Sequence, residues 1–306
     1  MAEGIQPAGK RLAGATLRVS LLTPLVFFFL TLVNLNAAPL ESAWAQFARL
    51  IDLTSDPLSA SPARLSDHVI EELDRMAPQK QAEVLVQRAI NHYEGAIEQI
   101  AQRAGGWRGQ INLTPEFTGM LTVAQNSNDL RVRAASIEVF LAAYDLPKDS
   151  GSFYQLTQRA QDEVGARPWA LWMLGALGNR GVEPAAAFDT LREYAKNGDE
   201  ETRYWAVSGL GLLGASETLE PLLDIFHHDP SARIREHAAC NLAQSGMLTQ
   251  DQRMGAVPEL LKFMDDPSLD PTTQGWVYQA LRDITGQWFG RNPAAWRNWW
   301  AQHPAP

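Results

Sequence analysis

The sequence repeats a nine-residue pattern four times: VRAASIEVF from Val132, ARPWALWML from Ala166, TRYWAVSGL from Thr202 and IREHAACNL from Ile234. Each copy has an arginine second, a small residue three positions later and a large apolar residue seven positions after the arginine. The arginines are residues 133, 167, 203 and 235, so the spacings are 34, 36 and 32. Because offsets of three and seven lie on one face of an α-helix, each copy predicts a helix packed against neighbours.

A fifth, degenerate copy, TQGWVYQAL from Thr273, has Gln274 in place of the arginine. Polar turns come before the repeated helices, and glycines that stop a helix follow several of them: Gly178, Gly214 and Gly246. The segments between predict the partner helices, at about 115–126, 150–161, 184–196, 216–228 and 251–265. Since one helix pair cannot bury its own apolar face, the pairs must stack. We predict an all-α, right-handed α-solenoid of about five to six helix pairs.

The pattern Asp-x-x-x-Val-Arg-x-x-Ala-x-x-x-Leu resembles the second helix of HEAT repeats, over roughly residues 112–286. In that family the matching arginine commonly pairs with the turn aspartate and ties adjacent repeats together. The resemblance implies this structural role for Arg133, Arg203 and Arg235, with Asp129, Asp199 and Asp229 suitably placed; an anion-binding ladder is the alternative. Arg167 fits less well, because Pro168 follows it. The resemblance implies no particular activity, since HEAT repeats serve many unrelated roles.

Both ends of the repeat region predict capping structure, because solenoid ends need to be covered. Residues 46–64 have the composition of a linker, and residues 65–111 predict an N-terminal cap with a short helix after Ser66 and a longer helix over about 79–103. The C-terminal segment 287–306 has a last helix from Asn292-Pro293 that carries Trp296, Trp299 and Trp300. This tail resembles the end of many bacterial HEAT-like proteins. Its tryptophans predict either a cap on the last repeat or an aromatic contact for a partner.

The first 45 residues predict export. Lys10, Arg11 and Arg18 precede an uncharged stretch over residues 19–40, whose apolar centre is LLTPLVFFFLTLV. Two interpretations remain open: a signal peptide cleaved after Ala43-Trp44-Ala45, or an uncleaved inner-membrane anchor. Both place the body outside the cytoplasm, either free in the periplasm or tethered to the membrane. Membrane contact is then expected only through residues 19–40, and only if the segment is uncleaved.

The charge balance favours a protein partner over a nucleic acid. The chain has a formal net charge of -9, and 34 acidic against 23 basic residues remain after the first 18 residues are set aside. Phosphate backbones would be repelled by such a body, so we predict no nucleic-acid partner. The single cysteine, Cys240, excludes an internal disulfide and CxxC motifs, and its apolar neighbours predict a buried core residue.

No motif for catalysis or cofactor binding is apparent, and we predict neither catalytic residues nor a cofactor. The leading hypothesis is a non-enzymatic scaffold of the cell envelope that binds a protein partner. The candidate contact residues are aromatic: Trp169, Trp172, Tyr204 and Trp205 on the repeated helices, and Trp296, Trp299 and Trp300 in the tail. One alternative is a HEAT-like enzyme with a metal at the turn of His227, His228 and His237. Another is a membrane-tethered spacer with no binding face.

Overall fold

The computed structural model describes residues 63–303, and these residues form a helical solenoid. The first helices of the pairs are α4 (Pro78–Ile90), α6 (Pro115–Gln125), α8 (Ser150–Asp162), α10 (Pro184–Asn197), α12 (Leu219–His228) and α15 (Val257–Phe263). The second helices are α5 (Ala96–Trp107), α7 (Leu130–Ala143), α9 (Arg167–Asn179), α11 (Glu200–Leu213), α13 (Ala232–Ala243) and α16 (Pro271–Thr285). The ends are α3 (Asp67–Arg75) and α17 (Pro293–Gln302). The predicted all-α solenoid is therefore confirmed.

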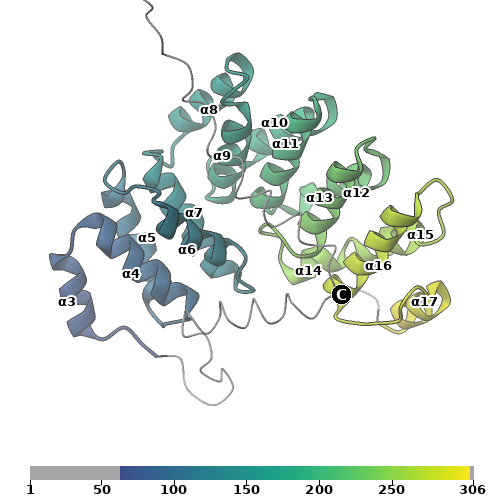
Figure 1. Ribbon diagram of the computed structural model, residues 1–306, viewed down its shortest axis with the longest axis horizontal. Helices are drawn as coiled ribbons and strands as arrows, with labels where there is room; N and C mark the ends of the chain where they lie inside the picture. The colour runs from purple at the N-terminus through teal and green to yellow at the C-terminus, as the bar shows by residue number, and fades with distance from the viewer. Residues whose placement is uncertain (1–62, 304–306) are drawn as a thin grey trace, which may run out of the picture. The chain divides into compact units, whose positions relative to one another are not determined.

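Figure 1 shows these helices along an arc, with α9, α11, α13 and α16 on its inner side and α8, α10, α12 and α15 on its outer side. The short elements η1 (Ser216–Thr218) and α14 (Gln250–Met254) precede α12 and α15. The helix starts follow the capping chemistry of the sequence. Asp129, Asp149, Asp199 and Asp270 each accept a hydrogen bond from a backbone N–H in the first turn of the helix that follows.

The N-terminal helices differ from the prediction. The long helix expected over 79–103 is divided into α4 and α5 by a turn at residues 91–95. In this turn His92 has φ 55° and Gly95 has φ 91°, and the backbone of Glu94 pairs with residues 63–65. The second part, α5, also continues to Trp107, beyond the end predicted near residue 103. The pair α4 and α5 is thus a repeat-like unit in its own right, and α3 alone covers its end.

From α9 onward, consecutive second helices run parallel and in close contact. A Cβ atom added to Gly175 of α9 would lie 2.3 Å from the carbonyl oxygen of Gly209 in α11. The next contacts keep the same order along both helices, because Ser208 and Gly211 of α11 face His237 and Asn241 of α13. Glycine at both crossing positions lets the backbones of α9 and α11 approach this closely.

The regular stacking is interrupted between α7 and α9. The Tyr144 ring at the end of α7 lies 5.4 Å from the Trp169 ring near the start of α9. Earlier in α7, Glu138 lies 3.6 Å from Arg180, which follows the end of α9. The contacts therefore run in opposite order along the two helices. The regular solenoid expected over 112–286 is in fact two stacks, α4–α7 and α8–α16.

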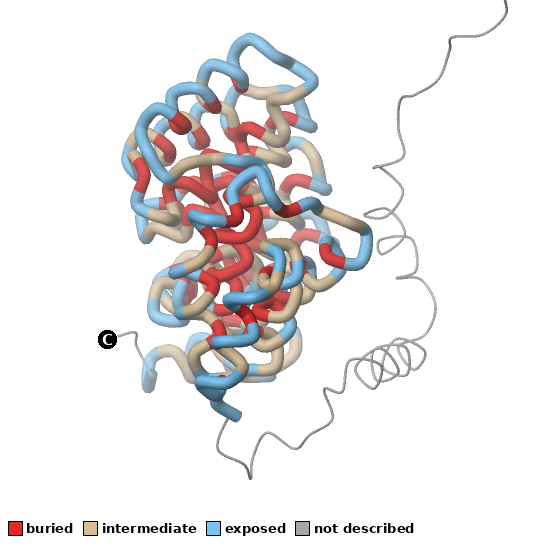
Figure 2. Tube along the Cα trace, turned by 90° about the vertical axis from the view of Figure 1, so that its left-hand side faces the viewer, coloured by how far each residue is buried: buried red, intermediate tan, exposed pale blue. Residues whose placement is uncertain are grey.

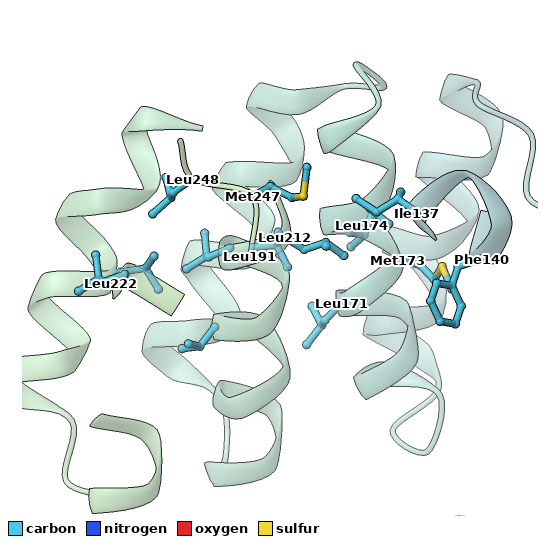
Figure 3. Packing of buried hydrophobic residues seen from close by; sticks show 14 of the residues in the cluster. Ile137, Phe140, Leu171, Met173, Leu174, Leu191, Leu212, Leu222, Met247 and Leu248 are labelled. Atoms are coloured by element: carbon cyan, nitrogen blue, oxygen red, sulfur yellow. The ribbon is translucent and has the colours of Figure 1, made fainter. Parts of the chain in front are cut away.

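A loop that follows α13 fills the junction between these stacks. We call residues 244–248 the strap. Arg133 of α7 donates from Nη1 to the carbonyl oxygens of Gln244 (2.8 Å) and Gly246 (2.6 Å). The backbone N–H of Met247 donates to Gly211 O at 2.8 Å. Figure 3 shows Met247 beside buried residues of α7, α9 and α11, and Figure 2 shows buried chain continuing through the centre of the molecule.

The helices around the strap are buried on nearly all sides. Val132–Ala142 in α7 is buried except at Ala134, and Gly209–Leu213 in α11 is buried throughout. A helix that is apolar all round needs covering on every face. The strap and α7 provide that cover on the inner side of α9 and α11. The C-terminal halves of these inner helices therefore belong to the core, and they are not a surface for a partner.

The predicted export segment lies outside the described residues, as does nearly all of the predicted linker. Within residues 63–303, no helix is both long enough and apolar enough to cross a membrane.

Candidate functional site

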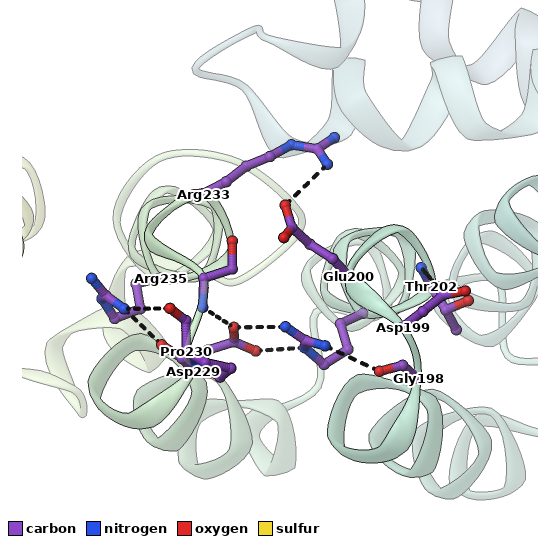
Figure 4. Close-up of polar contacts among 10 residues, drawn as sticks. Gly198, Asp199, Glu200, Thr202, Asp229, Pro230, Arg233 and Arg235 are labelled. Carbon is purple, nitrogen blue, oxygen red and sulfur yellow. Dashed lines mark hydrogen bonds and ion pairs between the residues drawn. The ribbon is translucent and has the colours of Figure 1, made fainter.

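Two of the repeat arginines have the predicted structural role. Arg203 donates from Nε and Nη2 to both carboxylate oxygens of Asp229, at 2.8 and 3.0 Å, and so ties α11 to the turn before α13. Arg235 donates to Asp270 at 2.8 Å and to the Thr273 hydroxyl at 3.0 Å in the next pair. Figure 4 shows Asp229 in the turn before α13, with Arg235 donating to the carbonyl oxygens of Asp229 and Pro230. These side chains hold the repeats in register and are not free to bind an anion.

The remaining two arginines, Arg133 and Arg167, contact carbonyl oxygens. Arg133 does not pair with Asp129, which instead binds Arg131; Arg133 holds the strap. Arg167 donates to the carbonyl of Ala160 at the end of its own partner helix, at 2.6 Å. Arg133 thus has a structural role, as the resemblance implies, but its partners are carbonyl oxygens of the strap and not Asp129.

The exposed part of the inner side carries a row of aromatic rings near the starts of the second helices. The residue two positions after each repeat arginine, or after Gln274, is aromatic in four consecutive pairs, and all four are half-buried: Trp169, Trp205, His237 and Trp276. We call the surface formed by these four residues with Trp172 and Tyr204 the inner face. Four of the predicted contact residues, Trp169, Trp172, Tyr204 and Trp205, thus lie together on this surface.

Sequence reasoning missed Trp276 as a member of this row. The repeat pattern contains the information needed, because TQGWVYQAL places Trp276 at the same repeat position as Trp169 and Trp205. His237 was considered only as a metal ligand. The repeat register predicts the side of the helix on which a residue lies, but the degenerate fifth copy obscured that register.

Parts of the inner face are already occupied by side chains of the chain itself. The Arg159 guanidinium lies 4.9 Å from the Trp169 ring, and Trp172 makes an edge contact with Phe140 at 5.1 Å. The Tyr204 ring lies between the Arg233 guanidinium at 4.1 Å and the His237 ring at 4.0 Å. No described residue places a cation over Trp205 or Trp276. These two indoles are the open members of the row.

His237 is neutral in the folded protein. Its Nε2 lies 2.7 Å from the hydroxyl of Ser208, and that hydroxyl also donates to the carbonyl of Tyr204 at 3.1 Å. Burial, aided by the nearby Arg233 charge, lowers the pKa of His237 from 6.5 to about 4. The contact between Ser208 and His237 joins α11 to α13, so this pair has the geometry of a structural link between the two helices.

The three histidines of the metal hypothesis do not converge. His227 hydrogen-bonds to Asp266 at 2.7 Å on the far side of α12, and His228 bonds to Asp224 at 2.9 Å. His237 lies on the inner face with Ser208. Within residues 63–303, no three side chains of the types that bind metal lie close enough to hold an ion. The described residues therefore do not support the alternative of a metal at these histidines, since consecutive residues at the end of a helix point in different directions.

The tryptophan-rich tail forms a cap. Trp296 is fully buried and donates from Nε1 to the carbonyl of Gly290 at 3.0 Å, while its ring meets Phe289 at 5.0 Å. Trp300 packs against the core, and Trp299 is half-buried and stacked on His303. Trp296 is therefore unable to contact a partner, and its place among the candidate contact residues is corrected. Of the three candidate tryptophans, Trp299 and Trp300 keep some exposed surface, and Trp288 at the start of the tail is 68% exposed.

Two hollows lie on the stack formed by α8–α16. The larger, about 520 Å³, lies between the outer helices α10 and α12, and its charged side chains of opposite sign include Arg203 and Asp229, which pair with each other. The smaller lies on the inner side between α13 and α16, beside Trp276. Cys240 lines this smaller hollow, where burial and the charges of Glu236 and Asp283 raise the pKa of its thiol to about 11.

Comparison with known proteins supports the repeat architecture. Residues 152–243 match the family model for HEAT repeats, which corresponds to α8–α13. The chain is thus a helical repeat protein, and its helices α8–α13 are similar to HEAT repeats. A search of curated proteins finds no match. Among solved structures, a designed armadillo repeat protein in complex with the peptide (KR)4 is similar at 16% identity and a TM-score of 0.35, covering 78% of this chain and 98% of that one.

Proposed function

We propose that this chain is a non-enzymatic scaffold of the cell envelope that binds a protein partner on its inner face. The observation that carries the proposal is the row of half-buried aromatic side chains in equivalent positions of four consecutive repeats. Aromatic residues that combine a large apolar area with a polar edge are the side chains most enriched at the centres of protein interfaces. A spacer needs no such row.

The location of the row also supports binding. Solenoids present extended surfaces because each repeat contacts only its neighbours, and the inner side of the arc is where those surfaces are concave. The outer helices, by contrast, present scattered charges that pair with one another, such as Arg192 with Asp189 and His228 with Asp224. We therefore place the partner across α9, α11, α13 and α16.

Site-specific photo-crosslinking in cells tests this proposal. A photoreactive amino acid at Gln279, an exposed residue of α16 beside Trp276, should give a discrete covalent adduct with a protein partner. The same amino acid at Tyr154, an exposed residue of the outer helix α8, is the matched control and should give none. Replacement of Trp205 by alanine should weaken the Gln279 adduct. An adduct from Tyr154 alone would reject the inner face as the binding surface.

The envelope location is proposed from the charge and hydropathy of residues 1–45 and needs its own test. This test is a measurement of the intact mass of the chain in each fraction after cell fractionation. A chain that begins at Gln46 in the periplasmic fraction indicates a cleaved signal peptide and a freely diffusing scaffold. A full-length chain in the membrane fraction indicates a tethered scaffold, whose partner then belongs to a membrane complex. A full-length chain in the cytoplasmic fraction rejects the envelope location.

A further inference from the structure

The hollow of about 520 Å³ between α10 and α12 lies on the outer side of the solenoid, and we call it the outer hollow. Its volume is within the range of sites that bind small molecules. On the inner side α11 and α13 are in close contact, because a Cβ atom added to Gly211 would overlap the side chain of Asn241. The outer helices of the same repeats are spread apart by the curvature of the arc (Figure 1), and the outer hollow is the space between them.

The two walls of the outer hollow carry charges of opposite sign. Arg192 and Lys196 lie one turn apart on α10, and Glu220 and Asp224 lie one turn apart on α12. All four side chains are exposed. No hydrogen bond or ion pair between described residues joins α10 to α12 across the gap. The two walls therefore remain available to a ligand that itself carries both signs of charge.

The charged groups of these walls are largely free. The side chains of Lys196 and Glu220 have no ion-pair or hydrogen-bond partner in the part of the chain that the structure describes. Arg192 and Asp224 each pair only with an exposed residue of their own helix, at 3.2 and 2.9 Å. Glu193, which also lines the hollow, accepts from an asparagine of its own helix at 2.7 Å. Exposed pairs within one helix contribute little, so a ligand can replace them.

The floor of the outer hollow is neutral and partly apolar. Arg203 and Asp229 pair with each other there, through two hydrogen bonds at 2.8 and 3.0 Å. Beside this pair lie the buried side chains of Ala195, Pro221 and Ile225. The floor therefore suits a molecule whose middle part is small and uncharged, and the walls suit charged groups at its two ends.

The positions of the charges set the length of such a molecule. Arg203 donates to Gly198 O, just after α10, and to Asp229, just after α12, so the two helices end side by side. Lys196 lies near this end, whereas Glu220 at the start of α12 precedes Asp229 by nine residues, which is about 13 Å along a helix. An extended tripeptide spans about 10 Å, and the flexible side chains of Lys196 and Glu220 can cover the remainder.

We propose that the outer hollow binds a short peptide of about three residues with free termini. The ammonium group of the peptide lies at Glu220 and Asp224, its carboxylate lies at Lys196 and Arg192, and its backbone lies on the floor. A single amino acid is too short to reach both ends. The site is separate from the inner face, so a peptide can bind there whether or not a protein partner is present.

Trialanine and two blocked forms of it test the outer hollow directly. Trialanine is titrated into the full chain while the backbone amide signals of Ala195 and Ile225 are followed by NMR. Binding through exposed charges should be weak, with a Kd of about 1 mM. Acetyl-trialanine lacks the ammonium group, and trialanine amide lacks the carboxylate. Each should bind about two- to fivefold more weakly than trialanine, because each loses one exposed charge contact.

Two variants assign the two ends of the peptide. Lys196→Gln should lose most of the preference for trialanine over trialanine amide, and Glu220→Gln should lose most of the preference for trialanine over acetyl-trialanine. Each variant should keep the preference that belongs to the opposite end. Lys80→Gln in α4 and Glu116→Gln in α6 are the matched controls, because they remove exposed charges outside the hollow and should leave every affinity unchanged. Thermal unfolding of each variant checks that the fold is retained.

Three results would overturn the inference: no shift of the Ala195 and Ile225 signals, equal affinity for trialanine and both blocked peptides, or variants at Lys196 and Glu220 that keep both preferences. The inner face provides a further check. Trp205→Ala should leave the affinity for trialanine unchanged, and a loss of affinity in this variant would place the peptide on the inner face and reject the outer hollow.

Discussion

The two stacks of this solenoid are built from similar helix pairs but are held together differently. In α8–α16 the second helices run parallel, and two successive repeats are each tied to the next by an arginine and an aspartate, Arg203 with Asp229 and Arg235 with Asp270. In α4–α7 the last helix meets α9 in the opposite sense, and Arg133 holds the strap, which is more than 100 residues away in the sequence. The α8–α16 stack is stabilised by local, repeated contacts, whereas the junction combines side-chain contacts between α7 and α9 with the long-range hydrogen bonds of Arg133 to the strap.

The largest expected effect comes from disturbing the parallel stack at its closest approach. Gly175→Ala would place a Cβ atom 2.3 Å from the Gly209 carbonyl oxygen, so α9 and α11 must separate. We expect the free energy of unfolding to fall by about 3 kcal/mol. Gly119 of α6 in the other stack has no atom within 4 Å of the same position. Gly119→Ala should raise the free energy of unfolding by about 0.5–1 kcal/mol, because alanine has a higher helix propensity than glycine.

Urea unfolding followed by circular dichroism measures both variants. Equal changes in the free energy of unfolding would show that the two stacks accommodate an added methyl group equally well, and would contradict the close packing at Gly175. A large loss at Gly119 would contradict the open surroundings of that residue.

The second prediction concerns the junction. Arg133→Met removes two part-buried hydrogen bonds to carbonyls of the strap, together with one to Ser127 in its own turn, and should cost about 2 kcal/mol. Because that contact joins the stacks, amide exchange in α4–α7 should rise together with exchange in the strap. Arg167→Met is the matched control, since Arg167 bonds only to carbonyls of its own helix pair. Hydrogen exchange with mass spectrometry should then show faster exchange confined to α8 and α9.

The difference between the stacks also explains what the sequence could predict. Periodicity and capping located α8, α10 and the repeated helices to within a few residues, because these features depend on neighbours along the chain. The reversal at α7 was missed, because it depends on how Arg133 and Gln244 meet in space. The division of α4 from α5 was missed, because the apolar spacing continues through the turn while His92 adopts positive φ. Periodicity also placed Trp169 and Trp205 at the same position of their helices. It did not predict that these two side chains keep exposed surface while Trp296 is fully buried.

A third prediction uses pH to weaken the parallel stack alone. The folded protein holds His237 neutral, with its pKa lowered to about 4, whereas the unfolded chain takes up a proton near pH 6.5. Stability from this residue is therefore fully present above pH 6.5 and is lost as the pH falls towards 4. We expect the free energy of unfolding to be roughly 1–2 kcal/mol lower at pH 5 than at pH 7.5.

The variant His237→Gln separates this contribution from other titrating groups. Urea unfolding at both pH values should show a smaller drop in the variant than in the wild type. Asp266 and Asp270 do not interfere, because hydrogen bonds to Ser268 and Thr273 lower their pKa values to about 2. Their contributions are lost only as the pH falls from about 4 to 2. An identical pH dependence in variant and wild type would show that His237 is not the sensitive group.

The smallest effect should be the same in both stacks. Thr114 caps α6 by accepting from the backbone N–H of Phe117, and Thr249 caps α14 in a reciprocal arrangement with Gln252. Each threonine stabilises only the first turn of its own helix, so replacement by alanine should cost about 1 kcal/mol at either site. Urea unfolding of the two variants provides the comparison. Arg253 of α14 donates to the carbonyl oxygens of Leu242 and Ser245. A clearly larger loss of unfolding free energy for Thr249→Ala would therefore mean that fraying of α14 also destabilises the strap. The junction would then depend on both arginines that surround the strap, and not on Arg133 alone.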